Sequence, residues 1–108
     1  MKNITAKIKF NDIERELPII KKDELIYLFL REGDIIINTL KSAISFQSHS
    51  YQSLINYEDS YIIIGNNKLD MTIIDKKIAK DYLYIVYNVL NETKCFEYKE
   101  VKWVILKN

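Results

Sequence analysis

The sequence is short of the residue types that most often build catalytic, metal and phosphate sites. Its 108 residues include one Cys, one His, one Pro and two Gly. One Cys excludes an intrachain disulfide and a cysteine-based zinc site within one chain, and one His excludes a His-rich metal site. Two glycines cannot form a Gly-rich phosphate loop, and the motifs GxGxxG, GxxxxGK[ST], GxSxG, HExxH and CxxC do not occur. We therefore expect a protein that is not an enzyme and that has no catalytic residues, bound metal or cofactor.

Charge of one sign is also lacking. The 16 Lys and Arg residues nearly balance the 15 Asp and Glu residues, so the net charge of +1 gives no overall attraction to nucleic acid or to an anionic membrane. The longest nearly apolar stretch, 82–90, is far shorter than the roughly 20 residues of a membrane-spanning helix. The first residues lack the apolar run of a signal peptide. These features predict a cytoplasmic protein with a single domain over 1–108.

The residues that are abundant favour strands. The chain has 19 Ile and 13 aromatic residues but only three Ala, and β-branched and aromatic side chains suit a pleated, half-buried surface. Several apolar segments are separated by short Asn- and Asp-containing turns. This pattern predicts a mainly β fold, an antiparallel meander closed as a small barrel or folded as a sandwich.

The clearest hairpin is at the start of the chain. Apolar and polar residues alternate over 4–10 and again over 13–19, and Asn11-Asp12 between them suits a two-residue turn. Arg15 lies on the apolar face and interrupts its pattern. Pro18 cannot donate a hydrogen bond to a neighbouring strand, so the second strand is predicted to lie at a sheet edge.

Further strands are predicted in the middle of the chain. The runs 25–31 and 34–39 flank Glu32-Gly33, and their nearly continuous apolar character favours strands covered on both faces. A strand is also predicted over 42–46. A third hairpin is predicted from 61–65 and 68–74, with its turn at Asn66-Asn67.

The last third of the chain is consistent with two interpretations. Residues 82–90 are rich in strand formers, and a turn at Asn91-Glu92-Thr93 would lead into a strand over 94–106, with a bulge at Lys99-Glu100. Helical spacing of apolar residues leaves an α+β alternative open, with one or two helices near 24–32 or 76–91.

Segment 47–60 is the longest part without a sustained apolar run, and we predict a loop there. Its Tyr, Ser, Asn and Gln content is typical of protein-binding loops, with Tyr51 and Tyr57 as anchors. The alternative is an ordinary connection, or a short helix that carries Leu54 and Ile55 into the core. The predicted partner-binding residues are His49, Tyr51, Tyr57, Glu58 and Asp59.

A basic cluster, Lys76, Lys77 and Lys80, is a second possible contact surface for a charged partner. Tyrosines that follow it could stack on the bases of single-stranded nucleic acid, although the balanced net charge argues against that function.

The leading functional hypothesis is a small protein-binding module that acts by docking. The size and the AT-rich codon bias suggest a phage or mobile-element accessory factor that inhibits a host defence protein. The alternatives are a small-molecule-binding β-barrel with a tyrosine-lined mouth, a weak binder of single-stranded nucleic acid, and an enzyme that uses His49 or Glu58 and Asp59. We also predict a homodimer, on the hypothesis that 61–64 forms an open, apolar strand edge.

Overall fold

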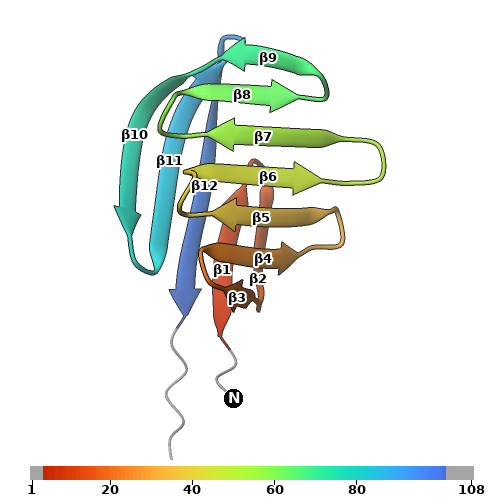
Figure 1. Cartoon of the computed structure of the whole chain (residues 1–108), viewed down its shortest axis with the longest axis vertical. Coiled ribbons are helices and arrows are strands. Elements are labelled where there is room, and N and C mark those ends of the chain that lie inside the picture. Colours follow the sequence, from red (N-terminus) through yellow and green to blue (C-terminus); the bar gives the residue numbers. More distant parts are fainter. Residues whose placement is uncertain (1–3, 102–108) are drawn as a thin grey trace, which may run out of the picture.

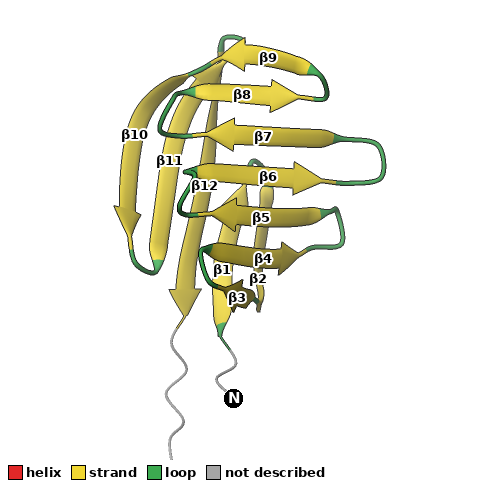
Figure 2. Cartoon of the chain, viewed as in Figure 1, coloured by secondary structure: helices red, strands yellow, loops and turns green. Residues whose placement is uncertain are grey.

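The computed structural model describes residues 4–101, and this part of the chain consists of strands, turns and short loops. Twelve strands form two antiparallel sheets (Figures 1 and 2). The predicted mainly β, antiparallel fold is confirmed. The α+β alternative is wrong, because residues 24–32 and 76–91 contain strands and no helix. Neither sheet closes on itself, so the molecule is not a barrel.

The chain forms two strands of the first sheet, then the whole of the second sheet, and then the remaining three strands of the first. The five-stranded sheet has the order β10-β11-β12-β1-β2, and the seven-stranded sheet is a meander from β3 to β9. The strands are β1 (Thr5–Phe10), β2 (Ile13–Pro18), β3 (Ile20–Lys22), β4 (Leu25–Phe29), β5 (Asp34–Asn38), β6 (Ala43–Gln47), β7 (Gln52–Asn56), β8 (Tyr61–Ile64), β9 (Asn67–Asp70), β10 (Thr72–Ala79), β11 (Tyr82–Val89) and β12 (Glu92–Val101).

The chain passes between the sheets at two buried apolar residues. Ile19 joins β2 to β3, and its N–H donates to the carbonyl oxygen of Ile4 at 2.9 Å. Met71 joins β9 to β10, and its N–H donates to the carbonyl oxygen of Ser60 at 3.3 Å. Because each crossing is hydrogen-bonded and buried, the sheets are joined at fixed corners. Figure 1 shows that the strands of one sheet run across those of the other.

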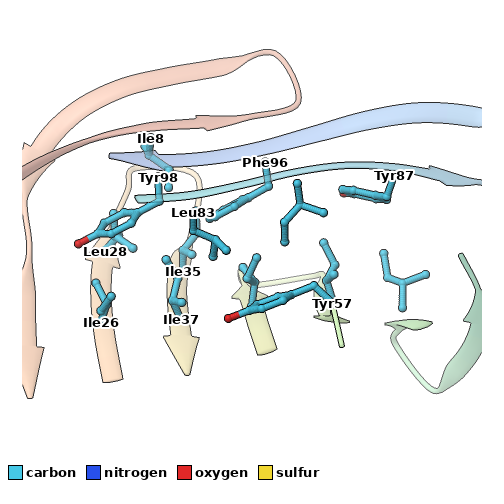
Figure 3. Close-up of a cluster of buried hydrophobic side chains, with 14 of the residues drawn as sticks. Ile8, Ile26, Leu28, Ile35, Ile37, Tyr57, Leu83, Tyr87, Phe96 and Tyr98 are labelled. Carbon is cyan, nitrogen blue, oxygen red and sulfur yellow. The ribbon is translucent and has the colours of Figure 1, made fainter. Parts of the chain in front are cut away.

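The two sheets enclose one core. Alternate residues of each strand point inward, as the period of two in a β-strand requires. Figure 3 shows side chains of the five-stranded sheet, such as Phe96 and Tyr98, facing Leu28 and Ile35 of the seven-stranded sheet. All four of these side chains are at most 2% exposed.

Most predicted hairpins are confirmed. Phe10 pairs with Ile13 across the Asn11-Asp12 turn, and Asn11 has the positive φ of 55° that this turn needs. Pro18 lies in β2, which is an edge strand as predicted. Arg15 lies opposite Ile8 on the inner face, as the sequence pattern predicts, and at this edge of the sheet it forms an ion pair with Glu32 at 2.7 Å, which links the two sheets.

Four local predictions are wrong. Segment 47–60 is not one loop, because its centre is β7. The third hairpin turns at Gly65-Asn66, since Ile64 pairs with Asn67. The turn predicted at Asn91-Glu92-Thr93 lies at Leu90-Asn91 instead. Both of these residues have positive φ, and Glu92 is the first residue of β12. The bulge predicted at Lys99-Glu100 is absent, because β12 pairs with β1 without a break there. The register shift lies instead between Ile73 and Asp75 in β10. The part of the predicted strand beyond Val101 lies outside the described residues.

Candidate functional site

The two sheets present very different outer faces. On the five-stranded sheet, cross-strand pairing places Glu14, Lys9, Glu97, Tyr84 and Lys77 in one row. Neighbours along this row have opposite charges or meet an aromatic ring, as at the 3.8 Å ion pair of Lys9 with Glu14. Charged and aromatic cross-strand pairs of this kind are favourable in contact with water, so this face is a solvated sheet surface.

The outer face of the seven-stranded sheet is apolar along its centre. The strand register places one side chain from each of the seven strands in a single row across the sheet. Five of the seven are large hydrophobic residues, and the only charged member stands at the far edge. We name this row and its outward-facing neighbours on β3–β8 the outer apolar face. From β3 to β9 the row is Ile20, Tyr27, Ile36, Ser45, Leu54, Ile63 and Lys68.

Aromatic side chains widen the outer apolar face on both sides of the row. Phe29 is 54% exposed, and its ring stacks on that of Tyr27 with 6.3 Å between the centroids. Tyr61 lies on the other side, with the Nζ of Lys68 4.3 Å from its ring centroid. Ile20, at the β3 edge, is 56% exposed. Among the outward-facing residues of β4 to β8, the only charged one is Asp34, at the end of β5.

The nearly continuous apolar runs 25–31 and 34–39 predict strands covered on both faces, and this prediction is wrong. In the structure only the inner residues of these runs are buried, and the outer ones are half-buried or exposed. No further layer among residues 4–101 covers them. Apolar residues on both sides of these strands therefore leave one side of the seven-stranded sheet open.

The strand edges are poor places for pairing with another chain. The predicted open edge at 61–64 is wrong, because β8 lies between β7 and β9. The actual edge strands are β2, β3, β9 and β10. β2 ends at Pro18, β3 has three residues of which two are Lys, and β10 has a register shift and carries Lys76 and Lys77. These are the features by which natural sheets prevent edge-to-edge association.

The predicted site residues of 47–60 are divided between the two ends of β7. His49 and Tyr51 lie in the turn before the strand, and Tyr57 to Asp59 lie in the turn after it, about 17 Å away. His49 borders a shallow, open cleft together with Arg31 and Asp34. Tyr51 is 43% exposed, and its ring lies 6.0 Å from that of Phe46.

Tyr57, a predicted surface anchor, is a core residue. It is 3% exposed, and burial raises the pKa of its hydroxyl. Glu58 and Asp59 are exposed in the turn that follows. Their backbone N–H groups donate to Oδ1 of Asn56 at 3.0 and 2.8 Å, so this acidic pair belongs to a tight Asx turn.

The basic cluster lies on and beside the edge strand β10. Lys76 donates from Nζ to the carbonyl oxygen of Tyr57 at 3.3 Å, which brings this lysine to the turn after β7. Lys77 lies on the opposite face of β10, with its Nζ 6.0 Å from the centroid of the Tyr84 ring. Lys80 is exposed in the turn to β11. The three lysines therefore do not form one surface.

A small cavity lies between the sheets near the β1–β2 and β11–β12 turns. Its volume is about 130 Å³. Its walls are mostly apolar and come from both sheets, while two of its polar members, Ser53 and Tyr87, are 9% and 1% exposed. Its other lining residues include Phe10, Ile55, Ile64, Val89, Glu92 and Lys94.

Other chemistry is limited in the part of the chain that the structure describes. Residues 4–101 contain no group of three or more His, Cys, Asp or Glu side chains placed to hold a metal ion. Within the same range no helix has the length and apolar character required to cross a membrane. Burial raises the pKa of the Cys95 thiol, which makes the nucleophilic thiolate scarcer at neutral pH.

Comparisons of this chain with family models, curated proteins and solved structures found no match.

Proposed function

We propose that this chain is a non-enzymatic protein-binding module that docks through the outer apolar face, and that a second copy of the same chain occupies this face. The observation that carries the proposal is the row of five large hydrophobic residues across β3 to β8. Ile20 is exposed and the other four are half-buried, and a large outward-facing apolar surface is typical of interaction sites in soluble proteins.

Charge complementarity favours a second copy as the occupant. Burying an unpaired charge in an interface is costly, so the centre of this face requires a partner surface without charges. The same face of another copy meets that requirement, because its outward positions on β4 to β8 are uncharged except for Asp34 at the margin. Two copies related by a two-fold axis would form an isologous contact.

The size of the face is sufficient for such a contact. Seven strands spaced about 4.8 Å apart span roughly 29 Å, and five-residue strands are about 17 Å long. Two copies would thus cover a plane of about 500 Å² each, or about 1,000 Å² together, the lower limit for a specific interface. Phe29, Tyr27 and Tyr61 supply the aromatic side chains that most often carry binding energy.

Sedimentation velocity on three proteins tests the proposal. The unaltered chain is expected to sediment at micromolar concentration as a particle of twice 12.9 kDa. Ile36→Lys places a charge at the centre of the outer apolar face and is expected to give a monomer. Val86→Lys is the matched control, since Val86 is also half-buried in a strand but lies on the outer face of the five-stranded sheet. It is expected to remain dimeric.

Two results would overturn the proposal. One is an unaltered chain that stays monomeric at high micromolar concentration, which would leave the face for a different protein. The other is an Ile36→Lys variant that is folded, as judged by circular dichroism, and still dimeric.

A further inference from the structure

We infer that the cavity between the two sheets is a binding site for a small, neutral, ring-sized molecule that is mostly apolar and carries one hydrogen-bonding group. This site is separate from the outer apolar face. Its lining residues point inward from both sheets, whereas the docking residues point outward from the seven-stranded sheet alone.

The walls of the cavity determine the apolar character of its ligand. Ile55 and Ile64 contribute from the seven-stranded sheet, and Phe10 and Val89 from the five-stranded sheet. The ring of Phe10 stacks on that of Phe46 with 5.4 Å between centroids, which fixes one wall. A polar molecule surrounded by these side chains would lose most of its hydrogen bonds to water, so an apolar body is favoured.

Two hydroxyl-bearing residues determine the polar part of the ligand. Ser53 and Tyr87 line the cavity from opposite sheets and are 9% and 1% exposed. A ligand that displaces water from their hydroxyl groups must replace the lost hydrogen bonds, so a polar group on the ligand is favoured. Together they can donate to, and accept from, one hydroxyl or N–H of a bound molecule.

The entrance and the volume set the charge and the size of the ligand. Glu92 and Lys94 stand at the mouth and pair with each other at 3.6 Å, so neither selects a charged ligand. The volume of about 130 Å³ is close to that of an apolar cavity of about 150 Å³ that holds benzene. A phenol therefore has the required chemistry: one ring and one hydroxyl.

The experiment titrates phenol, and separately benzene, into the ¹⁵N-labelled protein and follows the amide resonances. Saturable shifts are expected at Ser53, Ile64 and Tyr87, with phenol bound more tightly than benzene. Ser53→Ala and Tyr87→Phe each remove one hydroxyl, and each is expected to weaken phenol binding roughly threefold to tenfold while leaving benzene binding unchanged. The double variant is expected to bind both probes equally.

The matched control is the pair Ser45→Ala and Tyr84→Phe. It removes the same two kinds of atom from outward-facing positions, and phenol binding should not change. Absence of saturable binding at millimolar probe, which would mean a cavity filled by water only, overturns the inference. So does equal phenol affinity in the unaltered protein and in a folded double variant. Repeating the titration on Ile36→Lys, where dimerisation is expected to be lost, shows whether the two proposals fail independently.

Discussion

Replacing Tyr57 with alanine distinguishes between two roles for this residue, an exposed binding anchor and a buried core residue. The composition of segment 47–60 predicts an exposed anchor for a partner, and the structure places the ring in the core at 3% exposure (Figure 3). An exposed anchor would lose affinity on truncation and keep its stability. A core residue would lose stability, because the removed ring leaves a cavity between the sheets.

The size of the loss follows from the buried area. An aromatic side chain buries about 150–250 Å², which at about 25 cal/mol per Å² gives roughly 4–6 kcal/mol. The value for Tyr57 should fall near 3–5 kcal/mol, the usual range for truncating a buried aromatic residue. A domain of this length is typically stable by only about 5–15 kcal/mol, so the variant should be close to unfolding at moderate temperature.

Urea denaturation followed by circular dichroism measures this loss. Tyr57→Phe is the first control, since it keeps the ring and should cost far less than the alanine variant. Tyr51→Ala is the second control, because Tyr51 is 43% exposed and its truncation should cost less than about 1 kcal/mol. If Tyr57→Ala changes the free energy of unfolding by less than about 0.5 kcal/mol, the placement of Tyr57 in the core is wrong.

Three further predictions concern other parts of the molecule. Gly33→Ala should lower the free energy of unfolding by roughly 1–3 kcal/mol in urea melts, because the added Cβ would lie 2.7 Å from the carbonyl oxygen of Gln47 and 2.8 Å from the Phe46 ring; an unchanged midpoint would contradict this packing. Burial raises the pKa of Tyr87 from 10.0 to about 12, so the folded protein holds this proton more tightly than the unfolded chain. Stability from this group should be complete below pH 10 and lost as the pH rises towards 12, and Tyr87→Phe should reduce the slope of the free energy of unfolding against pH in that window; an equal slope in both proteins would refute the assignment. Cys95→Ser and His49→Ala should leave the dimer dissociation constant within a few-fold, and iodoacetamide should alkylate Cys95 more slowly than free cysteine at neutral pH, because burial raises the pKa of the thiol.

The sequence was sufficient for those parts of the fold that depend on local patterns. Alternation of apolar and polar residues, together with Asn11 at a turn, predicted the first hairpin in its observed register. The turn at Leu90-Asn91 was misplaced because Leu is an unusual residue at positive φ, and the register of β11 with β12 imposes that conformation.

The outer apolar face and the buried residues of segment 47–60 could not be predicted from local pattern alone. Segment 47–60 looks polar, yet Ser53 and Tyr57 are buried, because the neighbouring strands β6 and β8 set which residues of β7 face the core. The outer row also depends on the pairing of strands. Ile20 and Ile63 come from opposite ends of the seven-stranded sheet, and only the register of the strands between them places both in one row.

Disulfide trapping at Ser45 tests the central claim most directly, because Ser45 is the middle residue of the seven in the outer row. A two-fold axis that passes through the centre of this face brings the two copies of Ser45 close to each other. A chain carrying Ser45→Cys and Cys95→Ser should form an intermolecular disulfide rapidly under mild oxidation. The control chain carries Val86→Cys with Cys95→Ser, and its cysteine lies on the outer face of the five-stranded sheet, where only slow, collisional crosslinking is expected. Equal rates for the two chains would contradict docking through the outer apolar face.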